Sequence, residues 1–429
     1  MGENMLDINF IKDNAEYMKD VVKKRNMQCD IDALLAVYAE YKKLNQEIEE
    51  INHEINLNTK NLKECKTEES KNECIANGRQ LKEKLKTISD SFAEVKNKYD
   101  VLMLTVPNDM AEDTPVGEDD SGNVEVYKYS EPTKFNFKPK SHVELGKELD
   151  LLDFDRASKV AGSKFYFLKN QLVNLQLALE TFVIRKLTSK GFSPVITPDL
   201  AKTSILLGSG FNPRGAESNI YKLEDLDLNL IATAEITIGG MHANEQFSYT
   251  DLPKKYVGIS HCFRREAGAA GKLDAGLYRV HQFTKVEMYQ FTTVEQGEEA
   301  LQELLAIEKE IFEELKIPYH VVRICSGDMG APGYKKYDIE AWMPARGEFG
   351  AYGEVTSVGN FRTFQSRRLN ITYIDKDGKK QYVNTLNGTA IALTRVILAI
   401  MENYQQEDGS IKVPEVLQEL VGFDVISKK

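Results

Sequence analysis

The sequence predicts an α+β protein in which a two-helix coiled coil precedes a domain of antiparallel strands and helices. Apolar residues recur at heptad spacing twice between residues 37 and 102, which is typical of two helices packed against each other. Two strand-like runs around a Gly-containing loop, at residues 256–291, predict an antiparallel hairpin. An acidic segment with glycine and proline, residues 108–133, separates the two regions and is interpreted as a linker.

The composition is that of a soluble globular protein large enough for two or three domains. The chain has 429 residues, of which 42% are hydrophobic and 28% charged. It shows no signal-peptide pattern and no apolar run long enough to span a membrane, so we expect a cytoplasmic protein without a membrane partner. A net charge of −11 argues against a protein that coats nucleic acid indiscriminately, but a local basic surface can still bind a structured RNA.

The cysteines indicate reduced thiols in a reducing compartment. They are scattered and odd in number, with no CxxC and no Cys/His cluster at zinc spacing. The five are Cys29, Cys65, Cys74, Cys262 and Cys325.

Two heptad helices follow a shorter helix expected at residues 11–24. A polar stretch, residues 63–72, joins them, and Pro107 ends the second. An antiparallel helical hairpin buries such a seam within itself, so it needs no globular core. Its outward lysines fit a solvated coiled-coil face, or contacts to phosphates. The seam positions are Val37, Tyr41, Leu44, Ile48, Ile51, Ile55, Asn58 and Leu62, then Gly78, Leu81, Leu85, Ile88, Phe92, Val95, Tyr99 and Leu102.

After the acidic segment the chain mixes helices and strands. Helices are expected at residues 145–152, 171–190 and 294–315, and a last helix opens near Arg395 and runs to Tyr404. Strands are expected at residues 191–198, 336–344 and 353–357.

The hairpin at residues 256–291 carries charged side chains on one face of each strand. Alternation places Arg264 and Glu266 on one face of the first strand. On one face of the second strand it places Arg279, His281, Phe283, Lys285 and Glu287. Arginine for phosphate, an aromatic ring for a base and carboxylates for an amine or metal suit a nucleotide. The alternative is a solvent-exposed hairpin whose charged side chains form ion pairs, because antiparallel sheets often have one face in contact with solvent.

The order of residues is more specific than their alternation. Residues 263–266, 276–283 and 285–287 resemble motif 2 of class II aminoacyl-tRNA synthetases. Their residue order is similar to that of seryl-tRNA synthetases. The helix and strand up to Pro198 resemble motif 1, and residues 387–395 resemble motif 3. Between motifs 1 and 2, Thr233–Glu235 resembles the serine-binding loop of the same family, so the resemblance covers nearly the whole chain.

The resemblance implies a fold, an activity and partners. The fold would be a class II antiparallel sheet flanked by helices, with residues 1–107 as a tRNA-binding domain, 108–133 as a linker and 134–429 as the catalytic domain. The activity would be ATP-dependent conversion of L-serine to seryl-adenylate and transfer to the 3′ end of tRNA(Ser). A homodimer through motif 1 and binding of tRNA by the coiled-coil arm are implied as well.

The resemblance also assigns roles to residues. Arg264 and Arg395 would be catalytic, with Arg264 joining the α-phosphate to serine's carboxylate and Arg395 on the γ-phosphate. Mg²⁺ would be held by Glu354 and Ser357. ATP would contact Arg264, Arg265, Glu266, Val280, Phe283, Glu354, Val355, Thr356, Ser357 and Arg395. Serine would contact Thr233, Ala234, Glu235, Arg264, Glu287, Asn387 and Thr389.

The chain departs from the family pattern at a few positions. Thr389 stands where bacterial members usually have serine, and Ala390 and Thr394 replace glycines of motif 3. Residues 273–275 replace the usual Asp-Thr-Arg of the motif 2 loop, which puts its RNA contacts in doubt, and residues 358–360 replace Cys-Ser-Asn.

Two further interpretations stay open at this point. One is a paralogue that activates another amino acid or charges an unusual acceptor. The other is a catalytically silent RNA-binding or regulatory homologue. The presence of Arg264, Glu354 and Arg395 favours the active enzyme.

Overall fold

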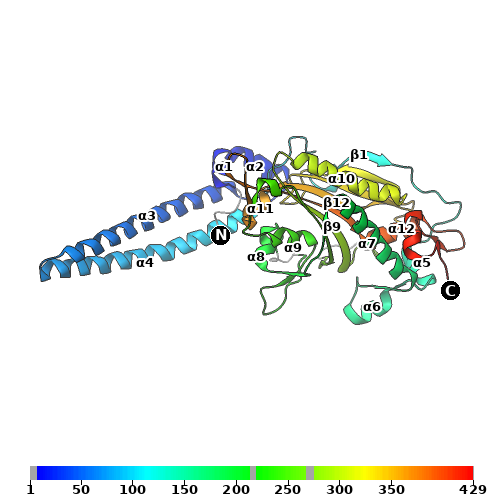
Figure 1. Cartoon of the computed structure of the whole chain (residues 1–429), viewed down its shortest axis with the longest axis horizontal. Helices are drawn as coiled ribbons and strands as arrows, with labels where there is room; N and C mark the ends of the chain where they lie inside the picture. The colour runs from blue at the N-terminus through cyan, green and yellow to red at the C-terminus, as the bar shows by residue number, and fades with distance from the viewer. Residues whose placement is uncertain (1–6, 213–218, 267–274, 429) are drawn as a thin grey trace. The chain divides into compact units, whose positions relative to one another are not determined.

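The structure is a computed structural model that describes residues 7–212, 219–266 and 275–428 (Figure 1). The chain divides into two compact units, Met1–Pro107 and Asn108–Lys429. Among the described residues, no helix combines the length and apolar character needed to cross a lipid bilayer.

The first unit is helical, and two long antiparallel helices dominate it. Helices α3 (Ile31–Glu64) and α4 (Glu68–Thr105) lie side by side along their length, which confirms the predicted coiled-coil hairpin (Figure 1). Helix α4 begins at Glu68, inside the stretch expected to be polar turn, because the hydroxyl of Thr67 caps it by accepting from the Ser70 N–H.

Two short helices stand where one was expected near the N-terminus. They are α1 (Ile8–Asp13) and α2 (Ala15–Lys24), and the chain breaks between them at Asn14, whose side chain donates to the Phe10 carbonyl. Such a side-chain bond competes with the helical backbone bonds. Both helices pack through Ile11, Met18 and Val22 against the base of α3 and α4.

An eight-stranded sheet forms the centre of the second unit. Its order is β1-β10-β11-β12-β15-β9-β8-β4, and every neighbouring pair is antiparallel except β4 and β8. This confirms the predicted antiparallel sheet. The strands are β1 (Val124–Tyr129), β4 (Ser193–Ile196), β8 (Lys254–Phe263), β9 (Gln282–Thr292), β10 (Tyr319–Arg323), β11 (Lys335–Met343), β12 (Ala351–Arg362) and β15 (Asn384–Ala392).

The segment expected to be a linker contributes to this sheet. Residues 124–129 form β1, which pairs with β10, and Asn108 donates to the carbonyls of Pro332 and Phe361. The acidic composition therefore marks an exposed edge strand and surface loops rather than a free connection, because an edge strand has few buried positions.

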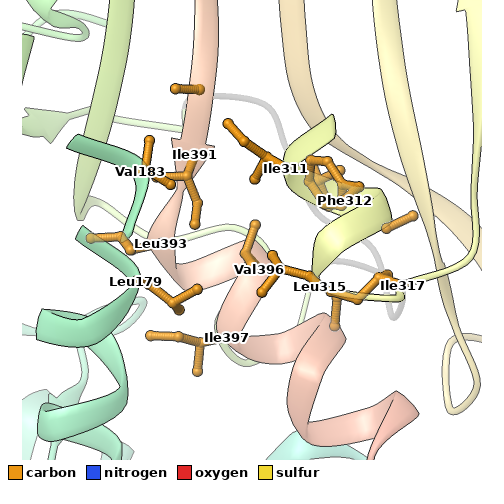
Figure 2. Packing of buried hydrophobic residues seen from close by; sticks show 14 of the residues in the cluster. Leu179, Val183, Ile311, Phe312, Leu315, Ile317, Ile391, Leu393, Val396 and Ile397 are labelled. Atoms are coloured by element: carbon orange, nitrogen blue, oxygen red, sulfur yellow. The ribbon is translucent and has the colours of Figure 1, made fainter. Parts of the chain in front are cut away.

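Three helices cover one face of the sheet. They are α7 (Gln171–Ser189), α10 (Gly297–Glu314) and α12 (Leu393–Asn403), close to their expected bounds. Figure 2 shows Val183, Ile311 and Val396, one from each helix, converging on the buried core beside Ile391 of β15. Strand β9 turns Val286 and Met288 toward this core.

The opposite face of β9 carries the polar side chains, because successive residues of a strand point to opposite faces. Two short helices, α9 (Ala234–Met241) and α11 (Phe364–Leu369), cover part of that face through a second cluster that includes Tyr289. The remaining elements are α5 (His142–Glu148), β2 (Leu152–Asp153), α6 (Phe154–Ala161), β3 (Phe167–Leu168), β5 (Leu200–Ala201), α8 (Thr203–Gly208), β6 (Asn229–Leu230), β7 (Gln246–Ser248), β13 (Thr372–Ile374), β14 (Lys380–Tyr382), β16 (Ile411–Lys412), α13 (Glu415–Val421) and β17 (Val425–Ile426).

Candidate active site

A cavity of about 460 Å³ opens on the polar face of the sheet. It brings together side chains from β9, β12, β15, α9 and α12 that lie up to about 160 residues apart in the chain. The predicted site residues that line it are Thr233, Glu235, Arg264, Glu266, Val280, Phe283, Glu287, Glu354, Val355, Thr356, Ser357, Asn387, Thr389 and Arg395.

Two predicted residues, Ala234 and Arg265, lie outside the lining. Ala234 is the first residue of α9 and is buried in the second hydrophobic cluster, close to Gly258 of β8. The backbone N–H of Arg265 donates to the carbonyl of Asn219, which ties the end of the hairpin to a neighbouring loop.

Arg264 and Glu266 lie just beyond the end of β8 rather than within a strand. The hairpin continues there through two bonds between Arg264 and His281: the Arg264 N–H donates to the His281 carbonyl, and His281 Nδ1 donates to the Arg264 carbonyl. Glu266 adopts a left-handed φ of 48°, which is costly for a residue with a side chain. Its carboxylate accepts from Arg279 Nη1 at 3.0 Å, so the turn holds it toward the cavity.

The guanidinium of Arg264 lies over the ring of Phe283, 5.2 Å from its centroid. Phe283 is on the polar face of β9, two residues before Lys285. A cation above a ring on the floor of a cavity forms a flat, positively charged surface, which suits a base and a phosphate.

Arg395, which with Arg264 forms the cationic end of the cavity, pairs with Glu354. Arg395 Nη1 donates to the backbone carbonyl of Glu354 at 2.8 Å and pairs with its carboxylate at 3.2 Å, while Nε donates to the Tyr278 carbonyl. Burial alone would raise the pKa of the Glu354 carboxyl, but Arg395, Lys336 and Arg264 together lower that pKa to about 2. Glu354 is therefore ionised at any physiological pH.

A β-bulge puts Glu354 and Ser357 on the same side of β12. Residues three apart in a regular strand point to opposite faces, but the pairing with β11 shifts between Glu354 and Thr356 and leaves Val355 extra. Val355 packs in the helix-covered core, and Thr356 donates to Glu308 of α10. Glu354 and Ser357 consequently both reach the cavity.

A further carboxylate, that of Asp338, lies next to Ser357. Asp338 of β11 is opposite Ser357 and accepts a hydrogen bond from its hydroxyl. Burial raises the pKa of the Asp338 carboxyl to about 6, against the nearby charge of Lys336, and its Oδ1 has no hydrogen bond although Lys336 Nζ is 3.5 Å away. Among the described residues no group of three His, Cys, Asp or Glu side chains forms a metal cage. Carboxylate and hydroxyl oxygens in such a sparse set fit Mg²⁺, which usually keeps ligands from substrate phosphates and water.

The other end of the cavity is acidic and rich in hydroxyl groups. Glu287 is 1% exposed and pairs with Lys285 at 2.5 Å, and Thr389 donates to the same Glu287 oxygen at 3.2 Å. Glu235 accepts from Gln365 Nε2 at 2.6 Å. Burial and the charge of Glu287 raise the pKa of the Glu235 carboxyl to about 7. The site thus offers two carboxylates and a hydroxyl to a small ligand with an ammonium and a hydroxyl group.

Comparisons with known proteins agree with this geometry. Residues 5–110 match the family model of the seryl-tRNA synthetase N-terminal domain, and residues 221–404 match that of the tRNA synthetase class II core domain (G, H, P, S and T). The serine–tRNA ligase of Treponema denticola is 48% identical over 98% of this chain and 100% of its own length. The chain belongs to the seryl-tRNA synthetase family.

Solved structures of the family superpose over the whole chain. The seryl-tRNA synthetase of Pyrococcus horikoshii, complexed with ATP, matches with a TM-score of 0.89 and 40% identity, covering 99% of this chain and 100% of that one. The cytoplasmic serine–tRNA ligase of Naegleria fowleri, in complex with AMP, matches with a TM-score of 0.83 and 29% identity, covering 99% of both chains.

The family departures found in the sequence leave the cavity chemistry in place. Thr389 keeps a hydroxyl bonded to Glu287, Ala390 is buried in the core, and Thr394 lines the cavity without displacing Arg395. Leu273 and Asp274 of the motif 2 loop lie outside the described residues.

Several polar residues at or beside this seryl-tRNA synthetase site were not assigned roles from the sequence, among them Lys285, Lys336, Asp338 and Gln365. Lys285 alternates with the assigned residues Phe283 and Glu287 along β9, so face alternation was the available signal for it, whereas Lys336 lies on β11, which carries no assigned residue. Asp338 and Gln365 had none: Gln365 reaches Glu235 across 130 positions of sequence, and its own carbonyl accepts from Tyr289. Such long-range contacts depend on the fold.

Proposed function

We propose that this chain is a serine–tRNA ligase, which activates L-serine with ATP and transfers the seryl group to the 3′ end of tRNA(Ser). Family membership supports the proposal. The observation that carries it is the division of one cavity into a cationic end at Arg264 and Arg395 and an acidic, hydroxyl-rich end at Glu235, Glu287 and Thr389. ATP phosphates suit the first end and serine suits the second.

Activation joins two anions, so positive charge and orientation are what the protein must supply. The carboxylate of serine attacks the α-phosphate and expels pyrophosphate. A carboxylate is already ionised near pH 7, so the step needs no strong base. Arg264 lines the cavity and is suited to hold both anions, and Arg395 would offset charge on the leaving phosphates.

The adenine ring is proposed to lie on Phe283, with Glu266 accepting from its amino group. The guanidinium of Arg264 lies 5.2 Å from the centroid of the Phe283 ring, which shows that the face of this ring is open to a cation–π or stacking contact. The pairing of Glu266 with Arg279 orients the carboxylate before ATP binds.

Mg²⁺ would be held by Glu354 and Ser357, the oxygen ligands that the bulge in β12 turns into the cavity. When bound, the ion supplies positive charge to phosphate oxygens. The low pKa of Glu354 keeps its carboxylate ionised for this role.

Serine selection rests on pairing its hydroxyl and ammonium groups. Glu287 and Thr389 are proposed to read the hydroxyl, and Glu235 with Thr233 the ammonium end. Both carboxylates are buried, so a ligand that lacks the hydroxyl leaves polar atoms without a partner.

Transfer requires tRNA, a second subunit and a suitable compartment, and each is a proposal. The helical hairpin of α3 and α4 is proposed to bind tRNA(Ser). A homodimer through the motif 1 elements is supported by Ile196 of the edge strand β4, which is 84% exposed. We assign the protein to the cytoplasm.

ATP–pyrophosphate exchange with each amino acid, followed by aminoacylation of tRNA, tests the proposal. Serine alone should support rapid exchange, and only tRNA(Ser) should be charged. Exchange with another amino acid would indicate a paralogue, and no exchange at all would indicate a silent homologue.

A further inference from the structure

A buried histidine outside the cavity holds the backbone at the exit of the motif 2 loop. His142, the first residue of α5, accepts a hydrogen bond at Nε2 from the Leu277 N–H at 3.0 Å. Because Nε2 is an acceptor here, the imidazole carries its proton on Nδ1, which lies 2.7 Å from Glu402 Oε1. Glu402 lies on α12, one heptad after Arg395, and both side chains of the pair are almost fully buried.

Both oxygens of the Glu402 carboxylate accept hydrogen bonds, which fixes the orientation of the group. Its Oε1 also accepts from the backbone N–H of His142 at 3.1 Å, and Oε2 accepts from the Ala345 N–H at 3.1 Å. Gly276 leaves room for the imidazole, since a Cβ at that position would collide with His142 Nε2 and approach Val143 to 2.7 Å.

The backbone next to Leu277 is held from the other side by the active site itself. Arg395 Nε donates to the Tyr278 carbonyl at 3.2 Å, and Arg395 also lies over the Tyr278 ring. The next residue, Arg279, orients Glu266. Helix α12 therefore fixes residues 277–279 twice, directly through Arg395 and indirectly through Glu402 and His142.

We propose that His142 and Glu402 are positioning residues for ATP: they set the place of Tyr278 and Arg279, and through them Arg395 and Glu266. Neither side chain lines the cavity. This inference rests on the proposed function only for the identity of the nucleotide, and ATP binding is measurable without turnover.

The test compares His142→Ala, Glu402→Gln and a matched control in the full-length chain. Titration calorimetry with ATP alone should show binding weakened by about tenfold to a hundredfold for His142→Ala, a cost typical of misplaced binding groups. The Michaelis constant for serine should stay within a fewfold of wild type, because Glu235, Glu287 and Thr389 are not held by this backbone. Free imidazole, which fits the vacated space, should restore ATP affinity.

Glu402→Gln keeps a carbonyl for His142 but loses the acceptor for Ala345, so its effect should be smaller than that of His142→Ala. His320→Ala is the control, because His320 also bonds two carboxylates, Glu125 and Glu340, without contacting residues 277–279. It should lower the melting temperature and leave ATP affinity unchanged.

Unchanged ATP affinity in folded His142→Ala, or equal loss of affinity for ATP and for serine, would overturn the positioning role. Lack of serine-dependent exchange in wild type would instead overturn the proposed function.

A different observation points to a covalent site in the helical hairpin. Cys65 caps the end of α3 and Cys74 lies in the second turn of α4, and their Sγ atoms are 3.6 Å apart. Both thiols are partly exposed. Asn58 Nδ2 donates to the Cys74 carbonyl and so holds the two helices in this register. We infer that Cys65 and Cys74 form a reversible disulfide on exposure to hydrogen peroxide.

The chemistry needs only the oxidant and the two thiols. One thiolate attacks the peroxide and becomes a sulfenic acid, with loss of water; the second thiol then displaces a second water as the S–S bond forms. The sulfur atoms must approach by about 1.5 Å to reach bonding distance. A metal site is not favoured, because no third Asp, Glu, His or Cys of the described chain joins the pair.

Intact-mass and peptide analysis of the full-length protein after hydrogen peroxide treatment tests the site. We expect the loss of two hydrogen atoms, a Cys65–Cys74 crosslinked peptide and reversal by dithiothreitol. Cys65→Ser should abolish the crosslink, whereas Cys29→Ser should not, because the Cys29 thiol accepts a hydrogen bond from the Thr105 hydroxyl and, among the described residues, is paired with no other thiol. Over-oxidation of either thiol without a crosslink, or a disulfide between two chains, would contradict the inference.

Discussion

Glu235 shows how burial prepares a carboxylate for a cationic ligand. Its pKa is raised to about 7 by burial and by the charge of Glu287, against the pull of Lys285 and the Gln365 amide. Near neutral pH the free site therefore holds a mixture of protonated and ionised Glu235. An arriving ammonium group favours the ionised form and lowers this pKa.

Serine binding should consequently release protons. Near pH 7 we expect release of up to about half a proton per site, and only about a tenth near pH 8, where the carboxyl is mostly ionised. Affinity for serine should rise as the pH increases from about 5.5 to 7, because protonated Glu235 must first ionise. Calorimetry in buffers of different ionisation enthalpy measures the release. Glu235→Gln should abolish it, and a release that persists in this variant would assign it to another group.

Arg264 offers a second test at this scale. Arg264→Ala removes the guanidinium that is proposed to offset repulsion between serine's carboxylate and the α-phosphate, so serine-dependent pyrophosphate exchange should fall by about 10² or more. Arg79→Ala is a suitable control, because Arg79 of α4 is exposed and lies outside the cavity. Exchange within a fewfold of wild type would refute the role of Arg264.

The hydroxyl of Thr389 offers a third test at the scale of single residues. Wild type should activate alanine and glycine far less well than serine, and Thr389→Val should narrow that gap by raising the Michaelis constant for serine. A site built to pair a hydroxyl discriminates by roughly 10⁴ against a ligand that lacks it. Comparable kcat/KM for alanine and serine in wild type would contradict the proposed pocket.

At the scale of elements, position along the sheet decides which residues meet. The heptad spacing predicted α3 and α4 because a seam in a two-helix hairpin is a local pattern. The acidic segment at residues 108–133 was misread because β1 is an exposed edge strand whose composition resembles that of a loop. Face alternation could not reveal that Glu354 and Ser357 share a side, since that depends on a bulge set by pairing with β11.

The resemblance to a family named half of the residues that line the cavity, and the fold supplied the others and what surrounds them. Asp338, Gln365 and the pair of His142 with Glu402 are each joined to the site by contacts across the sheet or between helices. No local sequence pattern encodes a contact across 130 or 260 positions. For such residues the structure was required.

The packing of α9 on the sheet gives a prediction at the same scale. Gly258 of β8 lies beneath this helix, and a Cβ there would contact Ala234 Cβ at 3.2 Å and collide with the end of Ile238. Gly258→Ala should therefore shift α9 and move Glu235 while leaving Arg395 in place. We expect the Michaelis constant for serine to rise by roughly a fewfold to tenfold, as overpacking typically strains its neighbours. The Michaelis constant for ATP, measured on the same sample, should not change; an equal rise in both would show general damage.

At the scale of the whole molecule, the helical hairpin that is proposed to bind tRNA belongs to the first compact unit and buries a seam of its own. The base of the hairpin is needed by the first unit: Tyr41 packs on Phe92 and Tyr99 there, and α1 and α2 pack on Ile31 and Met103. The outer part, beyond Leu44, makes contacts chiefly between α3 and α4. A shortened arm should therefore fold.

Deletion of residues 45–88, replaced by a short Gly-Ser turn, tests the role of the arm. The cut follows the register of the hairpin, in which Tyr41 lies opposite Phe92. Pyrophosphate exchange with serine should survive, since every residue that lines the cavity belongs to the second unit. Aminoacylation should fail through weaker tRNA binding.

The salt dependence of tRNA binding tests the same role. A plot of log affinity against log salt concentration should fall for the intact enzyme with a slope of about −0.7 to −0.9 per phosphate neutralised, and the shortened enzyme should show a shallower slope. If a well-folded shortened enzyme charges tRNA as efficiently as the full chain, at the same salt dependence, the arm serves folding or solubility alone and the catalytic proposal stands without it.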